Sequence, residues 1–136
     1  MNVNRVAALV SSTAVGIAVI FGLLVAGAPE EQRLLRLDEA RLQDLQQLAR
    51  IIDDYWDDHE ALPRSLSELV DGRRLSELPT DPATRSAYEY AVTEADAYQL
   101  CATFELPSSA ERTPDFWRHD DGRTCYRFDV EGAVRG

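Results

Sequence analysis

Four carboxylates and a histidine stand together in the sequence DDYWDDH, residues 53–59. Carboxylates in such a cluster are ligands that Ca²⁺ and Mg²⁺ prefer, and the DDxxD spacing is one that enzymes use to bind magnesium and diphosphate. In a helix, however, residues four apart share one flank. Asp53 would then lie beside Asp57, and Asp54 beside Asp58, as on a solvent-facing acidic surface.

The size of the chain decides between these two interpretations. A diphosphate-binding enzyme needs two facing aspartate motifs in a large helical bundle, whereas 136 residues allow one modest domain. We therefore predict a solvated acidic face, with a weak divalent-ion site at Asp53, Asp54, Asp57 and Asp58 as the alternative. His59 and His119 are the only histidines, and we expect both to be exposed.

No other motif suggests catalysis. The sequence has no nucleophile elbow, phosphate-binding loop or set of metal ligands. We predict that the protein is not an enzyme, that it has no catalytic, cofactor-binding or metal-binding residues, and that it has no small-molecule substrate. The net charge of −10 also argues against a nucleic acid partner, because such binding depends on neutralising phosphates.

The N-terminal part of the chain is apolar. Residues 6–28 contain no charged side chain and would form a helix about 34 Å long, enough to cross a hydrocarbon core of about 30 Å. Arg5 precedes this run and two glutamates follow it, which places the N-terminus in the cytoplasm. The alternative is a signal peptide cleaved after Ala28, but Pro29 would disfavour that cut.

We predict a transmembrane anchor at 1–28 and an exported domain at 29–136, in a single-pass protein of the bacterial inner membrane. The protein would then be held in the inner membrane through residues 6–28. Under both interpretations, anchor and signal peptide, the remainder of the chain is exported to the periplasm, where disulfides form.

The two cysteines fit that location. Cys101 and Cys125 each fall on the polar face of a predicted strand, opposite alternating aromatic and aliphatic residues. Buried free thiols would be expected on the apolar faces instead. We predict a disulfide between these two cysteines.

Periodicity predicts an α+β fold. An amphipathic helix is expected from Glu30 to about Glu60, with Leu35, Leu42, Ala49 and Trp56 recurring every seven residues on the face that meets a sheet. A short helix should follow, capped by Ser65 and Glu68. Alternation then predicts antiparallel strands at 87–92, 98–104 and 124–130. A fourth short strand could begin at Trp117, which gives a sheet of three to four strands.

This order of elements, and four motifs within it, resemble the major pseudopilin of bacterial type II secretion. The resemblance covers about residues 38–104 and includes YWDDHEALP, SLSELV, LPTDPATRSAYEYAV and AYQLCATF. It assigns structural roles to motif residues at the end of the long helix, in an Asp-Pro turn and in the following strand: Tyr55, Asp58, Pro63, Asp81, Pro82, Tyr88 and Tyr90.

The resemblance does not extend to the prepilin leader. The N-terminus has no Gly-Phe cleavage site and no glutamate within its apolar run, and Glu60 stands where the family usually has glycine. The resemblance implies a pilin-like periplasmic structural or interaction protein with protein partners in a type II secretion or pilus machine. Two alternatives remain: an accessory single-span subunit of another inner-membrane complex, and a small periplasmic ligand-binding module.

Overall fold

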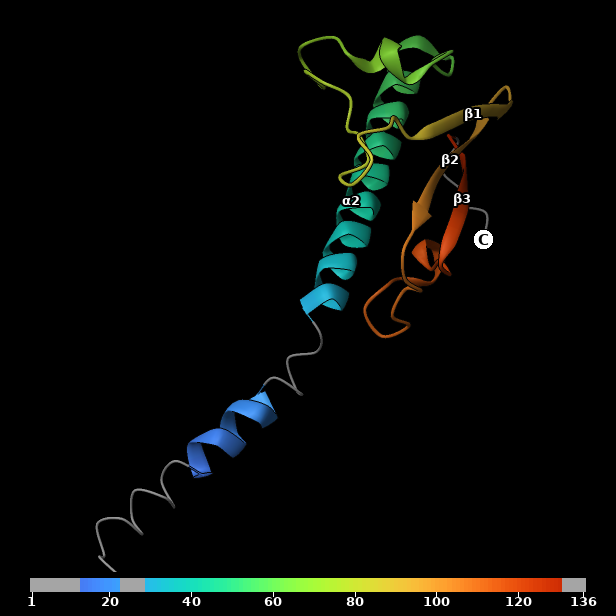
Figure 1. Cartoon of the computed structure of the whole chain (residues 1–136). Helices are drawn as coiled ribbons and strands as arrows, with labels where there is room; N and C mark the ends of the chain where they lie inside the picture. The colour runs from blue at the N-terminus through green and yellow to red at the C-terminus, as the bar shows by residue number, and fades with distance from the viewer. Residues whose placement is uncertain (1–12, 23–28, 131–136) are drawn as a thin grey trace, which may run out of the picture. The chain divides into compact units, whose positions relative to one another are not determined.

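The computed structural model describes residues 13–22 and 29–130 (Figure 1). In this part of the chain, a long helix is followed by an antiparallel sheet of three strands, which confirms the α+β prediction. The elements are α2 (Pro29–His59), the 3₁₀-helix η1 (Leu66–Leu69), β1 (Glu89–Glu94), β2 (Ala97–Phe104), the 3₁₀-helix η2 (Asp115–Trp117) and β3 (Gly122–Asp129).

Helix α2 is 31 residues long and matches the predicted span within one residue at each end. Its buried stripe includes Leu45, Leu48 and Ile52, which are spaced three and four residues apart. The helix ends at His59, and Glu60, the next residue, has a left-handed φ of 50°. A residue that ends a helix in this conformation is usually glycine, because side chains disfavour it. Glu60 thus adopts a backbone conformation that glycine favours.

Trp56 does not take the position predicted for it. The seven-residue spacing placed this side chain on the sheet-facing stripe, but it is half-buried and lies outside the hydrophobic core. The helix repeats every 3.6 residues, so a strict spacing of seven drifts around its surface over several turns. The buried stripe ends at Ile51 and Ile52, and Tyr55 packs at its margin.

The strands pair in the order β1-β2-β3, with boundaries within two residues of those predicted. Tyr98 lies opposite Phe128 and Leu100 opposite Tyr126, so the apolar side chains of β2 and β3 share one face. Within the unit Leu35–Gly136, Figure 1 shows the sheet along one side of α2. The core between helix and sheet contains the aromatic rings of Tyr88, Tyr98, Phe104, Tyr126 and Phe128.

Two local predictions were wrong. Ser65 makes no side-chain capping bond to η1; its hydroxyl group bonds that of Ser67 instead, and η1 is one 3₁₀ turn, too short for the predicted capping box. Trp117 lies in η2 and not in a strand. The chain from residue 105 to residue 121 therefore forms one long loop between β2 and β3, with Phe104 and Gly122 paired at its base.

The N-terminal residues that the structure describes, 13–22, are helical and carry exposed apolar side chains, including Ile17, Ile20 and Phe21. The remainder of the predicted anchor and the alternative cleavage site at Ala26–Ala28 lie outside the described residues. Across 13–22 and 29–130, no helix has both the length and the apolar character required to cross a bilayer. The chain divides into Met1–Leu34 and Leu35–Gly136, and the packing described below belongs to the second unit.

Candidate functional site

The aspartates at the end of α2 are all exposed, as a solvated face requires. Two of them have neutralising or polar neighbours: Asp58 forms an ion pair with Arg74, and Asp53 accepts a 3.4 Å hydrogen bond from the Tyr98 hydroxyl. Within the described ranges, no three His, Cys, Asp or Glu side chains come close enough together to hold a metal ion. These aspartates are exposed in a row along the surface of the last two turns of the helix.

The electrostatics of this row are repulsive. Partial burial, followed by repulsion from Asp54 and Asp57, raises the pKa of Asp53 above its ordinary value, although the Tyr98 hydrogen bond acts in the opposite direction. A raised carboxyl pKa means that the fold disfavours the charge. The environment of Asp53 therefore disfavours its ionised form.

The first group of motif residues joins the end of α2 to the segment that follows. The Tyr55 hydroxyl donates to Glu68 over 3.3 Å. The carbonyl oxygen of buried Pro63 accepts a 2.8 Å hydrogen bond from the Tyr90 hydroxyl, which connects this segment to β1. Their positions are those of residues that connect elements.

The second group lies around the Asp-Pro turn. The Asp81 Oδ1 atom accepts hydrogen bonds from the backbone N–H groups of Ala83 and Thr84, at 2.9 and 2.8 Å. Pro82 follows on the exposed side of the turn. The Tyr88 hydroxyl donates to Asp44 of α2 over 2.7 Å, and burial, together with this carboxylate, strongly raises the pKa of Tyr88. The turn and the start of the sheet are thus both bonded to the helix.

A buried arginine completes the connection between this turn and α2. The Arg41 side chain is 2% exposed. Its Nε atom donates to Asp81 over 2.6 Å, and its Nη1 atom donates to Asp38 over 2.7 Å. Burial acts to lower the pKa of Arg41, but the hydrogen bonds that it donates to Asp81 and Asp38 outweigh it, so that the net shift is upward. The guanidinium group is therefore ionised and fully paired.

The pKa of Asp81, the carboxylate partner of Arg41, is also shifted in the direction that favours the charged form. Burial alone would raise the pKa of Asp81, but the hydrogen bond from Arg41 and those from the Thr84 and Ala83 N–H groups lower it to about 2. The pair thus keeps both charges at neutral pH. We call Arg41, Asp38 and Asp81 the buried ionic cluster.

Asp38 extends the buried ionic cluster to the β2–β3 loop. Its two carboxylate oxygens accept hydrogen bonds from the Glu105 N–H at 2.9 and 3.1 Å, and one also accepts from the Leu106 N–H at 2.9 Å. These are the first residues of the loop. A single carboxylate therefore fixes the point at which the loop leaves the sheet and passes α2.

Sequence reasoning missed Arg41 and Asp38, because a charged pair three residues apart on a helix normally faces water. A signal was present, however. Residues 38, 41, 45, 48 and 52 follow the three–four spacing of one helix face, and the last three are Leu45, Leu48 and Ile52. Two charges that continue an apolar stripe indicate a buried pair.

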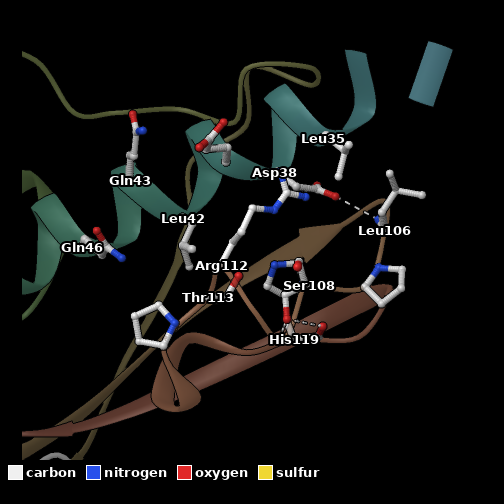
Figure 2. Close-up of a pocket in the computed structure, with 14 residues that line it drawn as sticks. Leu35, Asp38, Leu42, Gln43, Gln46, Leu106, Ser108, Arg112, Thr113 and His119 are labelled. Carbon is white, nitrogen blue, oxygen red and sulfur yellow. Dashed lines mark hydrogen bonds between the residues drawn. The ribbon is translucent and has the colours of Figure 1, made fainter. Parts of the chain in front are cut away.

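The loop and α2 enclose a groove of about 280 Å³. Figure 2 shows the Leu42 side chain pointing from the helix toward the loop, and the Arg112 side chain extending from the loop toward the helix. The residues that line the groove are Leu35, Asp38, Glu39, Leu42, Gln43 and Gln46 of α2, and Leu106, Pro107, Ser108, Ser109, Arg112, Thr113, Pro114 and His119 of the loop.

The two ends of the loop are held together by a clamp between Ser108 and His119. The Ser108 N–H and O–H groups donate to the His119 carbonyl oxygen at 2.8 and 3.1 Å, and the His119 N–H donates back to Ser108 Oγ at 3.0 Å. The His119 ring stacks on buried Phe104 with centroids 3.6 Å apart. His119 is therefore half-buried in the groove wall, and the prediction that it would be exposed was wrong.

The disulfide between Cys101 and Cys125 is present, as predicted, with Cα atoms 4.0 Å apart. The two residues lie directly opposite each other in the β2–β3 register, on the face of the sheet that points away from the tyrosine core. On the same face, Arg123 of β3 forms an ion pair with Glu89 of β1 at 2.7 Å. This ion pair connects the two outer strands of the sheet across β2.

Comparison with models of known protein families, with curated proteins and with solved structures gave no match to this chain.

Proposed function

We propose that this protein is a pseudopilin-like structural and interaction protein, anchored in the bacterial inner membrane by residues 6–28, with residues 29–136 in the periplasm. The observation that carries the proposal is the arrangement of α2 and the sheet. A long helix packs on a small antiparallel sheet, and the motif tyrosines bond the helix and the segment after it: Tyr88 bonds Asp44, and Tyr90 bonds Pro63.

Three further observations support this proposal. The described helical residues 13–22 expose Val15, Ile17, Val19, Ile20 and Phe21, a pattern suited to lipid or to a neighbouring membrane helix. The disulfide suits an oxidising compartment such as the periplasm. The motif residues act as connections between elements, which fits a protein whose role depends on its surface and not on a reaction centre.

Fractionation and crosslinking of the full chain test the proposal. Expressed in a bacterium that has type II secretion, the protein should stay with the membranes after alkaline extraction. A photo-crosslinker on the exposed face of α2, at Gln47, should capture the inner-membrane subunits of the secretion machine. Recovery in the soluble fraction would contradict the anchor. Capture of the subunits of a different inner-membrane complex would instead favour the accessory-subunit alternative.

A further inference from the structure

The groove between α2 and the β2–β3 loop is elongated along the helix. Its α2 wall extends from Leu35 to Gln46, which is about 16 Å at 1.5 Å per residue. An extended peptide rises about 3.3 Å per residue. A segment of about five residues therefore matches the length of the groove, whereas a single amino acid would fill only part of it.

The groove has the mixed lining that recognises peptide. Three leucines and two prolines offer apolar contact, and they come from both walls: Leu35, Leu42, Leu106, Pro107 and Pro114. Gln43 and Gln46 add amide groups along α2, and each amide can both donate to and accept from a peptide backbone. Apolar walls with a few placed polar groups are typical of ligand sites.

The groove lining contains an exposed acid, Glu39, on the α2 wall and an exposed cation, Arg112, on the loop wall, so a carboxylate can be bound only at the loop wall. Asp38 is already occupied by Arg41 and by two backbone N–H groups. Arg112 is an exposed cation in the wall, and within the described residues no acidic side chain pairs with it. A guanidinium group binds a carboxylate through two parallel hydrogen bonds. The position of Arg112 thus provides a receptor for an anionic end of a ligand.

We propose that this groove binds the C-terminal end of a protein partner, as an extended segment of apolar residues whose free α-carboxylate pairs with Arg112. A terminal carboxylate places the charge on the main chain, so the adjoining side chains can all be apolar and lie against the leucines. This inference rests on the proposed role as an interaction protein, and it names the chemistry of the partner.

The two walls are fixed before any ligand arrives. The Asp38 carboxylate accepts hydrogen bonds from the N–H groups of Glu105 and Leu106, where the loop begins. Ser108 and His119 are hydrogen-bonded to each other near the base of the loop. Thr113 and Arg112 follow a turn in which their N–H groups donate to the Ser109 carbonyl oxygen, at 3.0 and 3.2 Å. Binding to a preformed groove loses less conformational entropy than binding to a mobile loop.

Titration of the full chain with a synthetic peptide tests the inference. The probe is N-acetyl-Ala-Leu-Ala-Leu-Leu with a free C-terminal carboxylate, and the matched control is the same peptide as its C-terminal amide. The free acid should bind with a dissociation constant of about 0.1–1 mM. Amidation, or the Arg112→Gln substitution, should weaken binding at least about tenfold, the effect of losing a charge-assisted hydrogen bond. Arg50→Gln, an exposed α2 residue outside the groove, should leave binding unchanged.

Three results would overturn the inference: no binding of the acid at about 5 mM, equal binding of acid and amide, or equal loss in the Arg112 and Arg50 variants. A failure of the peptide-binding inference can be distinguished from a failure of the proposed function. Membrane retention and crosslinking at Gln47 do not involve Arg112, so they can succeed when the peptide fails to bind.

Discussion

Two groups of aspartates on α2 have the same chemistry and opposite environments. Asp54, Asp57 and Asp58 are exposed at the C-terminal end of the helix, and the ion pair that involves Asp58 lies at the surface. Asp38, more than four helical turns earlier, is buried with Arg41 and accepts hydrogen bonds from the backbone of the loop.

The difference shows that the partners of a carboxylate, not the number of carboxylates, decide its contribution. An exposed ion pair contributes about 0–1 kcal/mol to stability, because water screens it. Removing one partner from a buried pair costs about 3–5 kcal/mol, because an unpaired charge stays in the interior. The conspicuous acidic run in the sequence is therefore the less important group, and the inconspicuous Asp38 and Arg41 connect helix, turn and loop.

The largest expected effect is the loss of the buried guanidinium. Arg41→Met should lower the free energy of unfolding by about 3–5 kcal/mol, because Asp38 and Asp81 lose their common partner in the interior. Denaturant unfolding of the full chain measures this change. Arg74→Met, which removes the partner of exposed Asp58, is the matched control and should cost under about 1 kcal/mol. Equal losses in the two variants would contradict the distinction.

The disulfide lies on the face of the sheet that points away from the core. Its contribution to stability can be compared with that of the buried ionic cluster. Replacing both cysteines, Cys101→Ser with Cys125→Ser, should cost about 2–5 kcal/mol, because the unfolded chain regains the freedom that the bridge removed. Thermal melts with and without reductant measure the effect, and reductant should shift the wild type but not the double variant. Free reaction of both wild-type thiols with a maleimide in the native protein would contradict the bridge.

Acid should weaken the buried ionic cluster through Asp81. Asp81 stays ionised in the fold down to about pH 2, whereas its ordinary pKa is 3.8. The unfolded chain thus binds this proton first as the pH falls. The stabilisation from Asp81, about 2 kcal/mol, is complete above pH 5 and is lost as the pH falls toward 2. Unfolding free energies measured from pH 5 to pH 2 should show a shallower slope in Asp81→Asn. The same slope in wild type and variant would show that Asp81 is not the group responsible.

The smallest effect is expected at the exposed row. Asp53→Asn with Asp57→Asn should raise stability by no more than about 0.5 kcal/mol, because it relieves repulsion between residues four apart on the helix. Thermal melts in millimolar Ca²⁺ or Mg²⁺ check the alternative. A rise in melting temperature with metal that disappears in the variant would show an ion site, because a ligand that binds the native state stabilises it.

The positions of the elements could be predicted from the sequence, because apolar spacing records which side chains are buried. The repeat of Leu35, Leu42 and Ala49 predicted α2, and the alternation around Tyr98 and Tyr126 predicted the sheet face and hence the cysteine pair. Trp56 was assigned wrongly, because a spacing of seven residues was extended one step too far along a helix that repeats every 3.6.

The groove and the buried ionic cluster could not be predicted in the same way. Both depend on residues far apart in the chain: Asp38 meets Glu105 across 67 positions, and Arg41 meets Asp81 across 40. The path of the β2–β3 loop is set by these contacts and by the Ser108–His119 clamp, and not by local propensity. Sequence patterns report burial along one element, but not which two elements a charged side chain connects.

The most direct test of the difference between the two groups of aspartates is a pair of double-mutant cycles on the full chain. One cycle tests the buried ionic cluster and combines Arg41→Met with Asp81→Asn; the other tests the acidic helix end and combines Arg74→Met with Asp58→Asn. The coupling energy should be at least about 2 kcal/mol for Arg41 and Asp81, and under about 1 kcal/mol for Arg74 and Asp58. Coupling energies of the same size in both cycles would contradict the conclusion that the buried ionic cluster, and not the acidic helix end, holds α2 to the remainder of the domain.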